Sequence, residues 1–255
     1  GLVPAAETNA AAAAVARAAT AVAANLDLER LVALAQPAAP AQNAGDAAAT
    51  PLPPLGQLIA VARDAAFVFA YPAVLEGWRR QGAALSFFAP LADEAPDPAA
   101  DAVYLPGGYP ELHAGRLASA AGFLAGLRRM ASAGATIYGE CGGYMALGDT
   151  LTDADGVVHP MAGLLPLATS FAERRLHLGY REAALLADAP LGPARARFRA
   201  HEFHYATTIW HGDAVPLFAL RDATGRHLAP AGLRRGSVMG SFIHLIDRAE
   251  DLTTI

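Results

Sequence analysis

Apolar side chains recur at roughly helical spacing in the first 35 residues of the chain. Alanine dominates residues 8–35, and the larger apolar side chains among them are Val15, Val22, Leu26, Leu31 and Leu34. This spacing predicts a helical segment with a break or cap at residues 25–27. From residue 36 to residue 56 the chain becomes Pro/Ala-rich and loses its periodicity, which is typical of a linker.

From residue 57 onwards, short apolar runs alternate with helical patterns. The apolar runs predict strands over residues 58–62, 83–88, 102–105 and 136–138, and the helical patterns cover residues 72–81 and 111–133. Strands that alternate with helices through short loops predict a parallel sheet covered by helices. In such a sheet, ligands bind at the carboxyl ends of the strands.

The pattern changes beyond residue 149. Glycine and proline punctuate short alternating stretches there, so we expect the second half of the domain to be richer in antiparallel strands. A last strand over residues 237–242 would place His244 directly after its end.

Composition excludes several classes of function. Of the 255 residues, 54% are hydrophobic and 17% are charged, which suits a domain with a substantial core. A net charge of -5 gives no electrostatic reason to expect a nucleic-acid partner. The single cysteine excludes an internal disulfide and a cysteine-based zinc site. No apolar run reaches membrane-spanning length and no basic signal-peptide segment precedes the first helix, so we expect a cytoplasmic protein without membrane contact.

All 19 basic residues are arginine. Without lysine, the chain has neither an intact Walker A loop nor a residue for Schiff-base chemistry. If the protein belongs to a system that uses ATP, the phosphates bind outside this chain.

The single cysteine lies between glycines at a predicted strand-to-helix turn, Gly139-Glu140-Cys141-Gly142-Gly143. This spacing is the thiol version of the nucleophile elbow, in which the nucleophile occupies a strained turn flanked by glycines. We expect the helix N-terminus to lower the pKa of the thiol, and the Gly142 N–H to stabilise an oxyanion. The alternative is a buried cysteine on a small-residue turn, with no chemistry.

Two further segments suit a nucleophilic site. A cysteine nucleophile needs a base, and His244 follows a predicted strand that could end beside the turn. The Gly107-Gly108 turn, which follows another strand, could supply a second oxyanion donor. Taken singly, a histidine at a strand end is often structural, and a Gly-Gly turn often only joins a strand to a helix. The three segments in this order favour a cysteine–histidine site.

Five segments carry a family resemblance: residues 59–67 (IAVARDAAF), residues 104–112 (YLPGGYPEL), the turn around Cys141, residues 201–205 (HEFHY) and residues 240–245 (GSFIHL). Their order and spacing resemble the class I (triad) glutamine amidotransferase domain. Their amino-acid sequences resemble those of the cobyrinic acid (hydrogenobyrinic acid) a,c-diamide synthase family of cobalamin biosynthesis. The resemblance covers about residues 57 to 247, and residues 1–4 with the following helix resemble the end of that family's N-terminal synthetase domain.

The resemblance implies a three-layer, flavodoxin-like α/β domain over residues 57–255, with a mostly parallel central sheet and added antiparallel strands. It implies that Cys141 attacks the glutamine side-chain amide and releases ammonia through a glutamyl thioester, that His244 activates the thiol, and that the N–H groups of Gly108 and Gly142 hold the oxyanion. In the whole enzyme, a homo-oligomer, a synthetase domain would use the ammonia and Mg-ATP to amidate the a and c carboxylates of a corrin polycarboxylate. No cofactor or metal is implied for this chain.

Two departures from the family pattern limit this reading. Class I domains usually have a glutamate two residues after the histidine, where it orients the imidazole, but Ile246 occupies that position here. Asp247 would need a turn in the backbone to reach His244, so Glu202 or a backbone carbonyl is an alternative third member of the catalytic triad, after the cysteine and the histidine. The ATP-binding part is also absent from residues 1–35, which we read as a helical remnant of that domain. We therefore expect a fragment of a longer protein, or a glutaminase half that needs its partner.

Several polar residues outside the cysteine turn are candidate substrate or interface contacts: Gly107, His201, Glu202, His204 and Asp247. Arginines at positions 195, 197 and 199 alternate toward His201 and would share one strand face. That face is either a cationic wall for an anionic partner or the solvated side of an edge strand. A metal site is disfavoured, because Glu202 and His204 share the face opposite His201 and no further ligand is evident. We expect Asp64 to cap a loop or helix.

The sequence is also compatible with three other functions. The first is a related amidotransferase that acts on another acid, such as cobyric acid. The second is a protein with a redox-sensing or peptidase cysteine, and the third is a catalytically silent interaction module.

Overall fold

The computed structural model describes residues 10–36 and 51–249, and the chain divides into two units, residues 1–48 and 49–255. Three parts of the expected domains lie outside the described residues. They are residues 1–9 of the expected synthetase remnant, most of the expected linker over residues 36–56, and residues 250–255 at the end of the expected glutaminase domain.

The described part of the first unit is helical. It contains α1 (Ala11–Asn25) and α2 (Leu28–Leu34), so the predicted helical segment and its break are confirmed there. Asp27 caps α2, because its carboxylate accepts a hydrogen bond from the Arg30 N–H at 2.9 Å. Neither helix has a buried residue. Among the described residues, no single helix is long and apolar enough to cross a membrane, although α1 and α2 together meet that criterion across an 83° bend.

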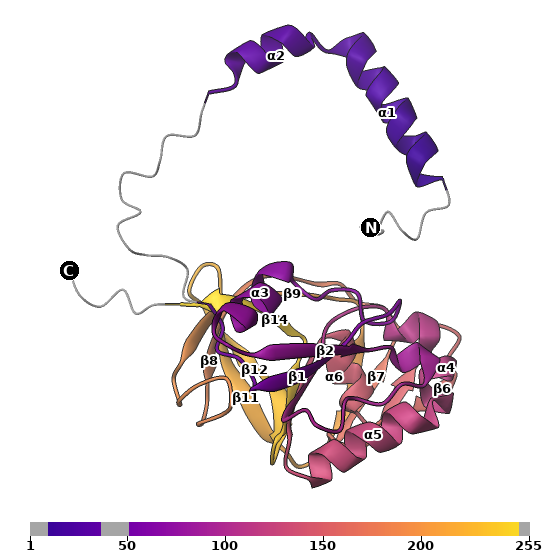
Figure 1. Cartoon of the computed structure of the whole chain (residues 1–255), viewed down its shortest axis with the longest axis vertical. Helices are drawn as coiled ribbons and strands as arrows, with labels where there is room; N and C mark the ends of the chain where they lie inside the picture. The colour runs from indigo at the N-terminus through magenta and orange to yellow at the C-terminus, as the bar shows by residue number, and fades with distance from the viewer. Residues whose placement is uncertain (1–9, 37–50, 250–255) are drawn as a thin grey trace, which may run out of the picture. The chain divides into compact units, whose positions relative to one another are not determined.

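The second unit is built on a ten-stranded sheet with a parallel and an antiparallel half (Figure 1). The parallel half comprises, in spatial order, β2 (Ala84–Phe88), β1 (Leu58–Ala62), β3 (Ala102–Leu105), β4 (Thr136–Glu140) and β13 (Val238–Ser241). The sheet continues antiparallel through β12 (His227–Arg235), β11 (Val215–Asp222), β8 (His177–Leu185), β9 (Arg197–His204) and β14 (Ile243–Arg248). The predicted parallel strands and the antiparallel second half are confirmed.

The antiparallel half curls back on the parallel half. Its outermost strand, β14, follows β13 in the chain after a single residue, Phe242, although four strands separate the two in the sheet. His244 therefore does not follow the last strand, as the sequence predicted, but is the second residue of a further strand that pairs with β9. The bend at Phe242 includes a hydrogen bond from the Ile243 N–H to the Ser241 hydroxyl at 3.1 Å.

Two apolar cores lie on opposite faces of the parallel strands, which gives the predicted three layers. One core contains apolar side chains of α4 (Ala114–Ser119), α5 (Ala121–Ser132) and α6 (Gly142–Leu147). The other contains side chains of α3 (Pro72–Arg80) and of the curled antiparallel strands. Figure 1 shows α3 and α5 on opposite sides of β1 and β2.

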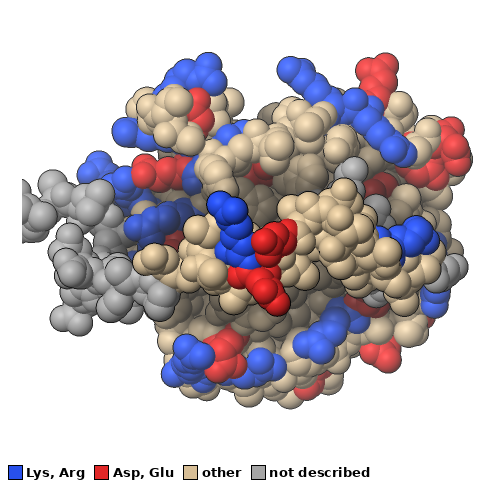
Figure 2. Space-filling model, turned by 90° about the horizontal axis from the view of Figure 1, so that it is seen from above, with Lys and Arg blue, Asp and Glu red and all other residues tan. Residues whose placement is uncertain are grey.

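A four-stranded sheet extends the layer that contains α6. Its strands, in spatial order, are β10 (Thr207–His211), β7 (Leu167–Ser170), β5 (Thr150–Thr152) and β6 (Val158–Pro160). On the face of the molecule shown in Figure 2, acidic and basic side chains are interspersed.

The helix predicted over residues 111–133 is interrupted. It consists of a short 3-10 turn, η3 (Pro110–His113), then α4, and then α5, with non-helical Ala120 between the two α-helices. The reason is a cap that is remote in sequence: Asp93, after the turn η2 (Pro90–Ala92), accepts a hydrogen bond from the Phe123 N–H at 3.0 Å. A capping carboxylate at that point favours the start of a new helix.

Candidate active site

Cys141 occupies the tight turn between β4 and α6. Its backbone has φ 46° and ψ -101°, a left-handed conformation that non-glycine residues rarely adopt, and its N–H donates to the Ser241 carbonyl at 2.8 Å. The adjoining helix packs closely on β3, because a Cβ atom on Gly143 would lie only 1.9 Å from the Leu105 carbonyl oxygen. The chain therefore has the strained, glycine-flanked geometry of a nucleophile elbow.

Burial dominates the acidity of the thiol. Cys141 is 5% exposed, and its sulfur donates a weak hydrogen bond to the Phe203 carbonyl at 3.8 Å. Burial, with a smaller contribution from the nearby Glu111 carboxyl, raises the pKa of the thiol to about 12. The Gly142 N–H does lower this pKa, as expected from the helix N-terminus, but burial outweighs it. The expectation of a lowered thiol pKa is therefore wrong for this closed site.

The Gly107-Gly108 turn lies against the cysteine turn. A Cβ atom on Gly142 would be 2.9 Å from the backbone nitrogen of Gly108, so the two predicted oxyanion donors are neighbours. The loop after β1 holds this turn in place: the Phe69 N–H donates to the Gly107 carbonyl at 2.9 Å. Gly108 lies in the loop after β3 and Gly142 is the first residue of α6 after β4, so both N–H groups follow the carboxyl ends of adjacent parallel strands.

His244 and Cys141 flank the same point in space. A Cβ atom on Gly107 would lie 2.6 Å from Cε1 of His244 and 3.5 Å from Cβ of Cys141, so the absence of a side chain at Gly107 leaves room for both. His244 is 2% exposed, and burial lowers the pKa of its imidazole to about 3, with smaller contributions from His201 and His204. The structure thus brings together the predicted nucleophile, the predicted base and Gly107.

His201 forms the outer wall of the histidine site. Its ring stacks on that of His244, with centroids 4.7 Å apart and planes 3° apart. Its Nε2 shares a 2.5 Å hydrogen bond with the hydroxyl of Tyr71, the residue before α3. Burial lowers the pKa of His201 and raises the pKa of Tyr71 to about 12. His201 also lines a mostly apolar hollow of about 650 Å³ with Tyr71 and Phe203.

Glu202 and His204 form a separate network on the opposite face of β9. Glu202 accepts two hydrogen bonds from Arg181, at 3.0 and 2.7 Å, and contacts Nε2 of His204 at 3.0 Å. The expectation that no further metal-type ligand accompanies them is wrong, because strand pairing places His177 opposite His204. The ligand atoms of these three residues lie within 4.8 Å of one another, but the guanidinium of Arg181 already neutralises the carboxylate.

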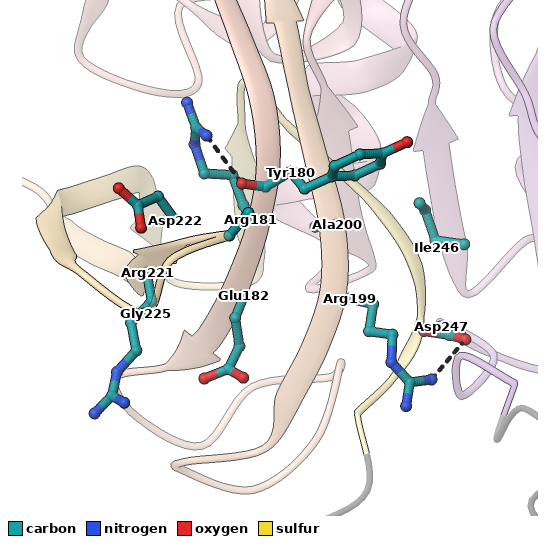
Figure 3. Close-up of a pocket in the computed structure, with 11 residues that line it drawn as sticks. Tyr180, Arg181, Glu182, Arg199, Ala200, Arg221, Asp222, Gly225, Ile246 and Asp247 are labelled. Carbon is teal, nitrogen blue, oxygen red and sulfur yellow. Dashed lines mark hydrogen bonds and ion pairs between the residues drawn. The ribbon is translucent and has the colours of Figure 1, made fainter.

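Asp247 lies on the same face of the β14–β9 pair as His244, because the register shifts between Leu245 and Asp247, but its carboxylate contacts Arg199 instead of the His244 ring. Its carboxylate accepts a hydrogen bond from Arg199 at 3.1 Å, at the edge of a hollow of about 500 Å³ (Figure 3). Ile246, at the family's usual position for the third member, is 45% exposed. The structure therefore brings neither Asp247 nor Glu202 to His244.

The alternating arginines do not form an uninterrupted cationic wall. Arg195 lies before β9 with φ 69°, Arg197 pairs with Glu182, and Arg199 pairs with Asp247. The edge-strand interpretation is also wrong, because β9 lies between β8 and β14. The expectation for Asp64 is confirmed: its carboxylate accepts hydrogen bonds from the N–H groups of Ala66 and Leu91, at 2.8 and 2.7 Å.

Two acidic residues at this site were not predicted from the sequence. Glu140 is 2% exposed and lies with Oε2 3.9 Å from Nδ1 of His244. Glu111 has a buried carboxylate oxygen without a hydrogen-bond partner in the described part of the chain, and burial raises its pKa to about 7. For Glu140, a signal was present: it is an acidic residue in a buried strand, directly before the nucleophile.

Comparison with known proteins places this site in a family. Residues 58–251, more than half of the chain, match the model of the CobB/CobQ-like glutamine amidotransferase domain. Hydrogenobyrinate a,c-diamide synthase of Rhizobium meliloti (strain 1021) is 54% identical over 250 residues, which cover 98% of this chain and 56% of that protein. The enzyme of the same name from Sinorhizobium sp is 59% identical over 226 residues, which cover 88% of this chain and 50% of that protein.

A solved structure of a glutamine amidotransferase from Thermotoga maritima is 16% identical, with a TM-score of 0.49, and the match covers 73% of this chain and 75% of that one. The chain spans about half the length of the curated relatives that it matches. On the family model and these relatives, the chain belongs to the CobB/CobQ-like glutamine amidotransferase domain family.

Proposed function

We propose that this chain is the glutaminase half of a hydrogenobyrinate (cobyrinate) a,c-diamide synthase. Cys141 is the nucleophile, His244 is its base, and the N–H groups of Gly108 and Gly142 hold the oxyanion. One observation carries the proposal: the strained turn of Cys141 and the buried imidazole of His244 meet at the space left by Gly107. Membership of the amidotransferase domain family supports glutamine as the substrate.

The reaction follows from these positions. The Cys141 thiol transfers its proton to His244 while the sulfur attacks the side-chain amide carbon of glutamine. The tetrahedral oxyanion is stabilised by the two N–H groups, and the imidazolium then protonates the leaving nitrogen, so that the C–N bond breaks and ammonia departs. Water attacks the glutamyl thioester after losing a proton to His244, and glutamate is released as the thiol regains that proton.

The protonation states of Cys141 and His244 support a coupled proton transfer. Because burial raises the pKa of Cys141 to about 12 and lowers that of His244 to about 3, the neutral thiol–imidazole pair is favoured before substrate binds. The proton therefore moves as the bond to glutamine forms, rather than in a preceding equilibrium.

The whole enzyme's reaction requires a second domain. We propose that ammonia passes to a synthetase domain that binds ATP and Mg²⁺ and amidates the a and c carboxylates of a corrin acid in the cytoplasm. The absence of lysine from this chain supports a separate site for ATP phosphates. Residues 1–35 belong to that domain in this proposal, because apolar side chains of α1 and α2, such as Leu31 and Val32, are 57% and 73% exposed and suit a packing partner.

A glutamine-derived diazo-ketone tests the glutaminase assignment. The chain is incubated with the reagent, alone and with the synthetase half, ATP and Mg²⁺, and the adduct is mapped by mass spectrometry. We expect labelling at Cys141 that glutamine suppresses and that Cys141→Ala abolishes, and we expect His244→Ala to slow labelling and ammonia release by orders of magnitude. If Cys141 stays unlabelled even with the synthetase half present, the proposal is wrong.

A further inference from the structure

Glu140 is a buried carboxyl group held in one orientation directly before the nucleophile. The hydroxyl of Tyr104 donates to its Oε2 at 2.8 Å, and the hydroxyl of Tyr138 donates to its Oε1 at 3.1 Å. The backbone N–H of Leu245 also donates to Oε1, at 3.1 Å. Donors from β3, β4 and β14 thus determine where this carboxyl points.

His244 presents an unpartnered nitrogen to this carboxyl. Its Nδ1 is buried and has no hydrogen-bond partner within the described residues, and Oε2 of Glu140 lies 3.9 Å away. A buried ring nitrogen without a partner is unfavourable, and catalytic hydrogen bonds are often long in substrate-free enzymes and shorten in the reacting complex. Closing this gap requires a movement of about 1 Å.

We propose that Glu140 is the positioning residue for His244 in glutamine hydrolysis. It accepts a hydrogen bond from Nδ1–H, which leaves Nε2 to take the proton of the Cys141 thiol, and it stabilises the imidazolium that results. The inference rests on the proposed glutaminase function. It assigns the third member of the site to the residue before the nucleophile, instead of a residue after the histidine.

The other acidic candidates are engaged elsewhere. Asp247 binds Arg199 across the strand pair, and Glu202 binds Arg181 and His204 on the other face of β9. Oδ1 of Asp247 is buried without a hydrogen-bond partner among the described residues, but neither Asp247 nor Glu202 makes a contact with His244 there, whereas Oε2 of Glu140 lies 3.9 Å from Nδ1 of His244.

Two opposing effects determine the pKa of Glu140. Burial raises its pKa to about 7, and the hydrogen bonds from Leu245, Tyr104 and Tyr138 act in the opposite direction. A proton that arrives on His244 therefore favours the ionised carboxylate beside it. The titratable groups that face Glu140 are Tyr71, Tyr104, Tyr138, Cys141 and His244.

The test is a comparison of Glu140→Gln with the matched control Glu182→Gln in the full chain, assayed with the synthetase half. Glu182, on β8, pairs with Arg197 of β9 outside the site. We expect Glu140→Gln to lower kcat for glutamine hydrolysis by at least about 100-fold with KM changed less than about threefold, since loss of the orienting carboxylate in a serine-protease triad costs about 10⁴ in kcat. Glu182→Gln should match the wild type.

The pH profile separates positioning from a purely structural role. In the wild type, kcat/KM should rise with pH through about 7 as Glu140 ionises, and this limb should disappear in Glu140→Gln. Glu111, whose pKa is also raised to about 7, remains in both proteins, so a limb that persists unchanged belongs to Glu111 and overturns the proposal. A large loss of kcat in Asp247→Asn with none in Glu140→Gln also overturns it.

A second measurement needs neither glutamine nor a variant of Glu140. Nitrogen NMR of ¹⁵N-histidine in the wild-type chain, with His244 assigned by His244→Asn, reports which ring nitrogen carries the proton. We expect the Nδ1–H tautomer, and an Nε2–H tautomer overturns the proposal. If this tautomer is found but Cys141 neither labels nor hydrolyses glutamine, the glutaminase function fails while the contact between Glu140 and His244 stands.

Discussion

Replacing Glu140 by glutamine should change how the stability of the chain depends on pH. Burial raises the pKa of this carboxyl from 4.5 to about 7, so the native state holds its proton more tightly than the unfolded state. Wild-type stability is therefore lost through this group as pH rises from about 4.5 to about 7. A shift of this size corresponds to about 3 kcal/mol, and a glutamine side chain carries no such penalty.

The quantity to measure is the difference between the two proteins. Urea unfolding of the wild type and of Glu140→Gln between about pH 4.5 and pH 8 gives two free energies of unfolding at each pH. Their difference should move in favour of the variant by about 3 kcal/mol across this range. His244 acts in the opposite direction, because its lowered pKa makes the native state gain stability as pH rises from about 3 to 6.5. Both proteins contain His244, so its own contribution largely cancels.

The sign of the result decides the interpretation. A difference that does not vary with pH would show that Glu140 has the same proton affinity in the folded and unfolded states. A difference that moves toward the wild type with rising pH would show that the three donors, together with a protonated His244, outweigh burial. Either result refutes the reasoning that burial determines the protonation of this carboxyl.

Three further changes test other parts of the site. Gly107→Ala should leave the chain folded but cost about 1–3 kcal/mol and most of the glutaminase activity, because the new methyl carbon would lie 2.6 Å from the His244 ring; thermal unfolding and ammonia release check this. Cys141 should react slowly with iodoacetamide at neutral pH and faster in Glu111→Gln, which removes a like charge and lowers the thiol pKa; a rate–pH profile checks both points. Arg181→Leu leaves a mostly buried carboxylate on β9 without its cation and should cost about 3 kcal/mol in a urea titration.

The parallel half of the fold was predictable because its elements are local. The strand at residues 58–62 and the helix that begins at Pro72 each have a pattern that a single segment defines, and the structure has them at those positions. The break at Ala120 was not predictable, because it depends on a cap from Asp93, which is close in space but remote in sequence. The strand β14, which carries His244, was missed because no residue type marks the bend at Phe242. Neither a glycine nor a proline occupies that position.

The site divides along the same line. Cys141 and the Gly107-Gly108 turn could be predicted because their residue types occur at short spacing in the sequence. The environment of the thiol could not be predicted in this way. Its pKa depends on how much chain covers it, and the sequence carries no local signal for the fold of β9 over the turn, where the Phe203 carbonyl contacts the sulfur. The sequence indicated the helix N-terminus, which lowers the pKa of the thiol, but not its burial, which raises this pKa by more.

The curl of the sheet explains why the acidic partner of His244 precedes the cysteine. If β13 simply ended after Ser241, a carboxylate two residues after His244 could turn back toward its ring. Here the chain continues as β14, whose register with β9 shifts between Leu245 and Asp247, and the residue two positions on, Ile246, is 45% exposed and lines the hollow beside His201. The same bend brings the Leu245 N–H and the His244 ring onto the end of β4, where Glu140 already stands beside the nucleophile. The bend between β13 and β14 at Phe242 therefore has two consequences. No carboxylate stands two residues after His244 to orient its ring, and the carboxyl group of Glu140 lies close enough to do so instead.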